Sequence, residues 1–598
     1  MSLIETEITS RALPIDPEIE ADAAKFQQML DAFQAGDLEE EVFKTFRLSN
    51  GIYGQRQGGT NQMLRVKFPY GSATPEQLEM IAHLCETYSR GWAHITTRQN
   101  FQMHYVQLNE VPSIMRQLGS VGLTTREACS DTVRNVMGCH LAGACPYEVL
   151  DISAWADAAF HYFLRNPISQ RLPRKFKINF SGCSTDCGQA MFNDIGVVAA
   201  SRTREDGSIE PGFRVYVAGG LGANPHEARA LEDFTPRESL MATLEAVVRT
   251  FEQTGNRDNK LRARMKWVVD TLGWEETQRR ILRSRRFLPA SVTWPDGIPD
   301  VVRERGDAPA GAAVGVEPTP VGQGTLVFIG RKGGFEQWCN ANVVRGVGNG
   351  TVSATASAEL GDVTAVQLRS LAAIQRDLGL QVRTTPRQNL VFRGLTEDQL
   401  PVLYTRLNEI GMATPGAELA RDVVSCPGAD TCNLAVTQSR GLAKAIGDRL
   451  EEEGLAEISG VRINISGCTN SCGQHHISDI GFYGAERRAH GQSAPGYQML
   501  IGGYVGEEQA HFGEKVLRLP AKAAPEAAAY VVERFATERN VGEQFRGWLE
   551  RVGGPKAIAD ELRHLDNFPT PAERPDFYVD YGETGPYIAE VGPGECAS

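Results

Sequence analysis

The chain has 598 residues, too many for one compact core, and at roughly 150–200 residues per domain it divides into three or four domains. Hydrophobic residues make up 41% and charged residues 23% of the chain, which excludes a disordered or fibrous protein. The net charge of −13 disfavours a nucleic-acid partner, because phosphate binding needs a positive field. No apolar run reaches the roughly 18 residues of a membrane span, so we expect a cytoplasmic protein with no membrane partner.

Short β-rich runs alternate with helical stretches in both halves of the chain, which predicts an α+β fold. The runs typical of strands are residues 63–68 and 325–330, and those typical of helices are residues 74–89 and 364–379. Thr74 and Pro75 predict the start of the first of these helices, because Thr is a good N-cap and Pro suits the first helical position.

The sequence repeats itself with a unit of almost 300 residues. KINFSGCSTDCGQ from Lys177 returns as RINISGCTNSCGQ from Arg462. Three landmarks recur in step: Cys183 and Cys468 lie 285 residues apart, Cys139 and Cys426 lie 287 apart, and Arg98 and Arg387 lie 289 apart. A duplicated domain pair therefore makes up most of the chain, and the Pro-, Gly- and Ala-rich residues 287–324 between the copies predict a linker.

Four cysteines of the second half have the spacing of cluster ligands. Five residues separate Cys426 from Cys432, and three separate Cys468 from Cys472. Structural zinc and inert buried thiols are the alternatives, but zinc pairs usually leave about two to four residues between ligands. A 4Fe–4S cluster takes four thiolates from widely separated loops, so the pattern favours a cluster.

Basic residues precede the first set of cysteines. Arg98 lies in TTRQN, Arg134 in TVRN, and Lys175 and Lys177 in RKFK. Each alone is more often a solvated surface charge. Lys175 and Lys177 stand two residues apart at the start of a predicted strand, where they share one face, and this predicts an anion site.

The cysteine spacing, preceded by TTRQN, RN and RKFK, resembles that of the siroheme-dependent nitrite and sulfite reductases over roughly residues 50–560. The resemblance implies a 4Fe–4S cluster on Cys426, Cys432, Cys468 and Cys472, with Cys472 also bridging to the axial position of the siroheme iron. It also implies that Arg98, Arg134, Lys175 and Lys177 bind the substrate anion. Siroheme carries eight carboxylates, so its site must be basic, and Arg56, Arg65 and Lys67 are candidates to bind them.

The family's fold implies two ferredoxin-like half-domains and two siroheme/4Fe–4S-type α/β domains. The expected organisation is an N-terminal extension (1–55), a first ferredoxin-like half-domain (56–125), a first siroheme/iron–sulfur-type domain (126–286), the linker (287–324), a second half-domain (325–415), a second siroheme and 4Fe–4S domain (416–560) and a C-terminal tail (561–598).

The activity implied is the six-electron reduction of sulfite to sulfide, of the assimilatory type, with nitrite reduction to ammonia as the alternative. Sulfite-reducing members resemble RKFK, whereas plant-type nitrite reductases tend to have a neutral residue at the position of Lys177, so sulfite is favoured. An iron–sulfur enzyme of corrinoid synthesis and a non-catalytic electron carrier are more distant alternatives.

The first half departs from the family pattern, because Cys139, Cys145, Cys183 and Cys187 keep the same ligand spacing. The repeat also pairs the basic residues of the two halves: Arg98 with Arg387, Arg134 with Arg421, Lys177 with Arg462, and Lys175 with Gly460. Two interpretations stay open: thiols packed as small core residues, or a second cluster with or without a second tetrapyrrole.

The electron donor is expected to be a partner protein, either a ferredoxin or a flavoprotein subunit. The glycines at 219, 220 and 222 do not match the dinucleotide-binding pattern, so no NADPH site is predicted. A cluster of arginines at 279, 280, 283, 285 and 286 is a candidate docking surface for an acidic ferredoxin, and a solvated helix face is the alternative.

Overall fold

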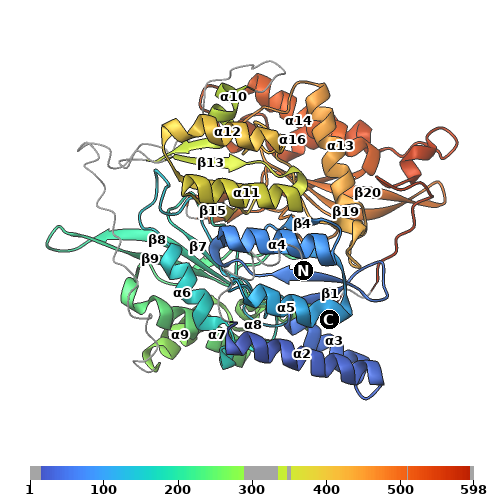
Figure 1. The fold of residues 1–598 in the computed structure, drawn as a ribbon. Helices are drawn as coiled ribbons and strands as arrows, with labels where there is room; N and C mark the ends of the chain where they lie inside the picture. Colours follow the sequence, from blue (N-terminus) through green and yellow to red (C-terminus); the bar gives the residue numbers. More distant parts are fainter. Residues whose placement is uncertain (1–14, 289–333, 347–351, 508, 593–594, 596–598) are drawn as a thin grey trace.

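The computed structural model describes residues 15–288, 334–346, 352–507, 509–592 and 595. The linker expected at 287–324 falls outside the described residues from position 289 on, as does the strand expected at 325–330. Figure 1 shows the two copies as two layers, with the first half (blue to green) below the second (yellow to red).

Two small α/β units each carry a five-stranded sheet and exchange one strand. The first unit contains β1 (Ile52–Gly54), β2 (Asn61–Val66), α4 (Pro75–Tyr88), β4 (Trp92–Ile95), β5 (Phe101–Gln107) and α5 (Val111–Gly119). The second contains α10 (Phe335–Asn342), β12 (Val343–Arg345), β13 (Val352–Ala356), α11 (Ala365–Leu378), β15 (Gln381–Thr384), β16 (Leu390–Leu395) and α12 (Leu400–Glu409). Strand β14 (Asp362–Thr364) of the second half closes the sheet β1-β2-β5-β4-β14, and β3 (Ser72–Ala73) of the first half closes β12-β13-β16-β15-β3. The halves therefore share backbone hydrogen bonds as well as side-chain contacts.

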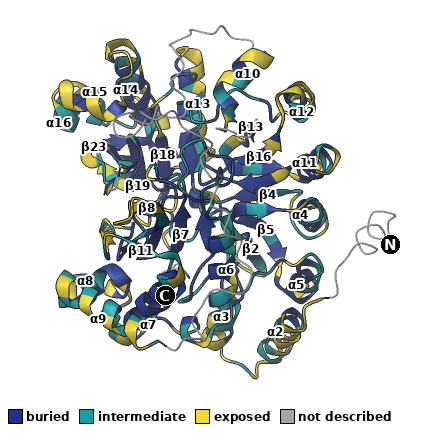
Figure 2. Ribbon diagram, turned by 90° about the vertical axis from the view of Figure 1, so that its left-hand side faces the viewer, coloured by how far each residue is buried: buried dark blue, intermediate teal, exposed yellow. Residues whose placement is uncertain are grey.

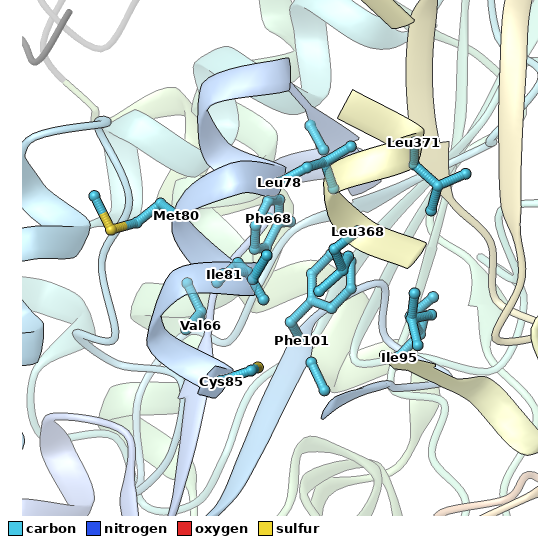
Figure 3. Close-up of a cluster of buried hydrophobic side chains, with 14 of the residues drawn as sticks. Val66, Phe68, Leu78, Met80, Ile81, Cys85, Ile95, Phe101, Leu368 and Leu371 are labelled. Carbon is cyan, nitrogen blue, oxygen red and sulfur yellow. The ribbon is translucent and has the colours of Figure 1, made fainter. Parts of the chain in front are cut away.

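Helices α4 and α11 pack against each other over the joined sheets (Figure 3). Leu78 and Ile81 from α4 and Leu368 and Leu371 from α11 are fully buried there, together with Phe68 and other apolar side chains of the sheets. Each helix begins with a capping box. Thr74 accepts a hydrogen bond from the Gln77 backbone at 3.2 Å, and Thr364 does the same with Gln367 at 3.2 Å. The helix start predicted at Thr74 and Pro75 is confirmed.

The two larger units are mixed sheets covered by helices. The first contains β6 (Met137–Gly138), α6 (Ser153–Phe163), β7 (Ile178–Ser181), β8 (Ile195–Thr203), β9 (Ile209–Val217), β10 (Arg229–Ala230), β11 (Thr235–Pro236), α7 (Leu240–Thr254), α8 (Met265–Leu272) and α9 (Trp274–Arg286). The second contains β17 (Val424–Ser425), α13 (Ser439–Glu452), β18 (Ile463–Ser466), β19 (Ile480–Ala489), β20 (Gln492–Ile501), β21 (Tyr504–Gly506), β22 (Gln509–His511), β23 (Glu514–Pro520), α14 (Ala524–Glu538), α15 (Phe545–Arg551) and α16 (Gly554–Leu562). The sheet orders are β10-β9-β8-β7-β6 and β17-β18-β19-β20-β23. In both, the first three strands in chain order are parallel, so the loops after them meet at one edge.

The duplication also sets how the halves meet at the centre. Gln189 and Gln474, which lie 285 residues apart, exchange two side-chain hydrogen bonds of 2.8 and 2.6 Å.

The helices α2 (Pro17–Ala35) and α3 (Glu40–Ser49) pack beside the first half, and Arg47 of α3 forms an ion pair with Glu595 near the chain end. Figure 2 shows the sheets buried inside a layer of helices with exposed outer faces. Within the described ranges, no helix combines the length and apolarity that crossing a bilayer requires.

Candidate active site

Four thiols converge where β17 and β18 end. Cys426 follows β17 directly, and Cys468 comes two residues after β18, its parallel neighbour. The Gly467 backbone N–H donates to the Cys426 Sγ at 3.3 Å. Burial and the adjacent thiols of Cys472, Cys426 and Cys432 raise the pKa of Cys468, so all four sulfurs lie within electrostatic reach of one another.

The loop that carries Cys468 and Cys472 is held against β18 by its glycine. A Cβ atom on Gly473 would lie 1.9 Å from the Ile465 carbonyl oxygen, so only glycine fits. The Gly473 N–H donates to the Ser466 hydroxyl at 3.0 Å, and the Asn464 amide donates to the Gly473 carbonyl at 2.9 Å. The glycines of SGCTNSCGQ thus have a structural reason.

The donor set fits a cluster better than a single ion. Five residues separate Cys426 from Cys432, whereas zinc pairs usually leave about two to four residues between ligands, which disfavours the zinc alternative. Four thiols on two loops are the ligand set of a 4Fe–4S cluster. Cys472 is the most exposed cysteine among the described residues, and its carbonyl accepts a hydrogen bond from the Thr97 hydroxyl at 2.8 Å. The TTRQN segment of the first half is therefore tied to the second cysteine loop.

Arg98 and Arg134 are fixed by neutral oxygens. Arg98 donates to the Asn135 carbonyl at 2.7 Å and to the Asn179 side chain at 3.2 Å. Arg134 donates to the carbonyls of Ala128 at 2.8 Å and Ser130 at 2.7 Å. Burial, and then Arg134, lower the pKa of Arg98 to about 9, which shows that its positive charge is incompletely compensated.

Lys175 and Lys177 lie close together just before the strand rather than in it, because β7 begins at Ile178. Burial, followed by Arg98, Arg264 and Lys175, lowers the pKa of Lys177 well below its usual range. The structure thus brings Arg98, Lys175 and Lys177 together with Arg264. Arg134 lies close enough to lower the pKa of Arg98.

Arg264 and its carboxylate partner were missed by sequence reasoning. Arg264 donates to Asp194 at 2.6 Å, and Asp194 also accepts the Lys177 backbone N–H at 3.0 Å. Arg264 stands in no motif. Asp194, however, recurs as Asp479 in the duplicated segment, and this repeat was a signal that could have found it.

This region leaves polar atoms without partners. The Nε atoms of Arg98 and Arg264 are buried and make no hydrogen bond within the described residues. In the described ranges, no carboxylate forms an ion pair with Arg98, Arg134 or Lys177. Buried donors and uncompensated cations of this kind fit a bound polyanion, and siroheme with its anionic substrate is such a ligand.

The mirrored set of the second half is compensated by the chain itself. Four ion pairs hold it: Arg387 with Asp422 at 2.8 Å and with Glu418 at 3.5 Å, Arg462 with Glu418 at 3.1 Å, and Arg421 with Glu451 at 2.8 Å. The two halves share a backbone plan but differ in charge balance: among the described residues no carboxylate pairs with Arg98, whereas carboxylates pair with Arg387, Arg421 and Arg462.

Arg56, Arg65 and Lys67, the candidates to bind the carboxylates of siroheme, contact groups of the protein itself. Arg56 donates to the carbonyls of Ala429 at 3.1 Å and Ala435 at 3.3 Å and so supports the Cys426–Cys432 loop. Arg65 donates to the Ala128 carbonyl at 3.2 Å. Lys67 is buried 3.8 Å from Glu127, and burial lowers the pKa of Lys67 to about 8.

Two carboxylates neutralise part of the charge of the arginine-rich helix α9. Arg279 and Arg280 share Glu276 at 2.7 and 2.6 Å, and Arg285 pairs with Glu232. Three of the five arginines therefore pair within the chain, and the helix keeps a net positive charge.

Comparisons with known proteins agree with this geometry. The model of the nitrite and sulphite reductase 4Fe–4S domain matches residues 129–286 and 416–562, and the model of the nitrite/sulfite reductase ferredoxin-like half domain matches residues 53–121 and 345–410. The assimilatory ferredoxin-dependent nitrite reductase of Haloferax mediterranei is 30% identical over 549 residues, covering 89% of this chain and 88% of the relative. A sulfite reductase [ferredoxin] of Mycolicibacterium paratuberculosis is 29% identical over 511 residues, covering 84% and 83%.

A solved structure is also similar. The NirA protein of Mycobacterium tuberculosis superposes with a TM-score of 0.72 at 25% identity, covering 92% of this chain and 98% of that chain. The duplicated α+β fold expected from the sequence is confirmed. The chain belongs to the nitrite and sulfite reductase family, whose members are oxidoreductases that carry siroheme and a 4Fe–4S cluster.

Proposed function

We propose that this chain reduces sulfite to sulfide in six electron steps, as an assimilatory enzyme, with Arg98, Arg134, Lys175 and Lys177 binding the anion. The observation that carries the proposal is that Arg98 and Lys177 are buried close to each other, and that among the described residues no carboxylate forms an ion pair with Arg98, Arg134 or Lys177. We assign Cys426, Cys432, Cys468 and Cys472 as the cluster ligands and Cys472 as the bridge to siroheme. When bound, siroheme and the cluster supply the electrons.

The protein's own residues bind and protonate the substrate. The guanidinium groups of Arg98 and Arg134 are oriented by backbone carbonyls, so they neutralise a bound anion without rearranging. Each oxygen removed from the substrate leaves as water and needs protons. Because burial and neighbouring cations lower the pKa of Lys177, its ammonium gives up a proton more readily than a solvated lysine does.

The choice of sulfite over nitrite depends on Lys177. Coulomb attraction at 4 Å is about 4 kcal/mol per charge pair at an effective dielectric constant of 20, so a dianion gains about twice as much as a monoanion. Nitrite is the second candidate, since the relative from Haloferax mediterranei is named a nitrite reductase. The names of the relatives also support ferredoxin as the electron donor.

The test is the variant Lys177→Asn, assayed with reduced methyl viologen and each anion in turn. We expect kcat/KM for sulfite to fall at least tenfold further than kcat/KM for nitrite, a difference of at least about 1.4 kcal/mol, because solvent and neighbouring charges reduce the full Coulomb difference of about 4 kcal/mol. Lys444→Asn is the control, because it removes a positive charge from an exposed position on α13. Equal losses with both anions would refute the preference for sulfite. An enzyme of corrinoid synthesis would oxidise no viologen with either anion.

A further inference from the structure

The first half of the chain holds four thiols that the proposed active site does not use. Cys139, Cys145, Cys183 and Cys187 are thiols and not disulfide partners. Cys139 follows β6 directly and Cys183 comes two residues after β7, its parallel neighbour, and Cys139 and Cys145 lie within electrostatic reach of Cys183 and Cys187. The Thr185 hydroxyl lies 3.0 Å from the Cys183 Sγ and 3.5 Å from the Cys187 Sγ. The four sulfurs therefore gather at one point instead of packing separately into the core.

Their loop has the same backbone construction as the loop of the proposed cluster ligands. A Cβ atom on Gly188 would lie 2.0 Å from the Phe180 carbonyl oxygen, the counterpart of the close approach at Gly473. The Gly188 N–H donates to the Ser181 hydroxyl at 3.1 Å, and the Asn179 amide donates to the Gly188 carbonyl at 2.9 Å.

The backbone dihedrals agree as well. Asp186, with φ of 56°, matches Ser471, with φ of 57°, and both are residues for which the left-handed region is uncommon. Thiols that only fill a core need no such loop, so the retained geometry points to a ligand.

Buried positive charge lies beside these thiols. Arg383 and Arg393, on β15 and β16, are each 4% exposed. Arg383 donates to the carbonyls of Cys139 at 3.1 Å and Ala142 at 3.3 Å, and Arg393 also donates to Ala142. The Arg393 Nε is buried without a partner among the described residues. The carboxylates of Asp151 and Glu148 offset part of this positive charge, and a cluster held by four thiolates, which carries net negative charge, would offset the rest.

We propose that Cys139, Cys145, Cys183 and Cys187 bind a second 4Fe–4S cluster that has no tetrapyrrole attached. When a preassembled cluster is transferred to the chain, four S–H bonds are replaced by four Fe–S bonds, the four protons and the four ligands that the cluster carried pass to the solvent, and no electron is transferred. The proposal does not depend on whether the substrate is sulfite or nitrite.

The lack of a tetrapyrrole follows from the charges beside Cys187. His140, Glu418, Arg387 and Arg462 are among the residues that line a small cavity there. Glu418 pairs with both arginines. The mirrored position therefore lacks the unpaired positive charge that the carboxylates of a second siroheme need.

The experiment counts iron, acid-labile sulfide and siroheme in the full-length holoenzyme after anaerobic reconstitution with iron and sulfide. Two clusters and one siroheme give about nine irons and eight sulfides per chain, against about five and four for one cluster. A count of about five irons, or zinc in place of the extra iron, would overturn the proposal without need of any variant.

The variant Cys183→Ser/Cys187→Ser locates the extra iron. We expect it to lose about four irons and four sulfides per chain while its siroheme content stays at the wild-type level. Cys339→Ser is the control, since Cys339 lies on α10, outside both cysteine sets. A variant with the full wild-type iron count would place the extra cluster elsewhere and refute the assignment. Reduction of sulfite and of nitrite by the enzyme is assayed separately from the iron count, so failure of the proposed function does not affect this result.

Discussion

Arg98 and Arg387 are matched by the duplication but have opposite charge environments, and replacing each by Met should therefore have opposite effects on stability and activity. Arg98 is held by neutral oxygens, and burial together with Arg134 lowers its pKa to about 9. Burial also opposes the charge of Arg387, but Glu418 and Asp422 outweigh it and raise the pKa of Arg387.

The magnitudes follow from these contacts. A pKa lowered from 12.5 to about 9 corresponds to roughly 5 kcal/mol against the charged form of Arg98, and its two charged hydrogen bonds return roughly 3–6 kcal/mol. Arg98→Met should thus change the free energy of unfolding by no more than about 2 kcal/mol. Arg387→Met leaves the partly buried carboxylate of Asp422 without its guanidinium partner and leaves Glu418 with Arg462 alone, which costs about 3–5 kcal/mol.

The assay is urea unfolding of both variants beside viologen-linked anion reduction. We expect Arg98→Met to unfold near the wild-type midpoint with activity reduced at least a hundredfold, the scale on which removing one preorganised donor acts. Arg387→Met should unfold earlier and keep most of its activity per folded, cofactor-loaded chain. If Arg98→Met were destabilised as strongly as Arg387→Met, the inference that carboxylates compensate the charge of Arg387 but not that of Arg98 would be wrong.

Two further outcomes follow from buried groups. Burial, followed by His94, lowers the pKa of His104 to about 3, below the unfolded value of 6.5, so the unfolded chain binds more protons and stability falls as pH falls from about 6.5 towards 3. Between pH 6.5 and 4.5 the wild type should lose about 2 kcal/mol of its free energy of unfolding through His104, and His104→Phe should not show this loss. The urea midpoints of both proteins at each pH measure it, and an unchanged dependence of the midpoint on pH in His104→Phe would contradict the prediction. Gly473→Ala should lower iron and sulfide per chain, because its Cβ meets the Ile465 carbonyl at 1.9 Å, whereas Gly447→Ala, which meets nothing within 4 Å, should not. Full iron content in Gly473→Ala would show that the loop tolerates displacement.

Much of the fold and of the candidate site could be predicted from patterns along the sequence. The helix start at Thr74 is a contact between residues three positions apart, so the sequence contains both partners. The cysteine spacing and the duplication are likewise patterns along the chain, and they led to the family that the comparisons show. The structure then brought the cysteine loops of each half together because the strands before them are parallel neighbours.

Other features depend on residues that meet only after folding. The sequence already contained two equivalent sets of cysteines and two nearly equivalent sets of basic residues. It could not show which set of basic residues is paired with carboxylates. Tertiary contacts decide this, because Asp422 and Glu418 reach Arg387 whereas Arg98 is met only by neutral oxygens. The free energy of a buried charge depends on what surrounds it in space, and no spacing along the chain records those neighbours. The sequence by itself therefore determined the duplicated fold, the family and the ligand types, while the tertiary structure decided which set of basic residues is paired with carboxylates.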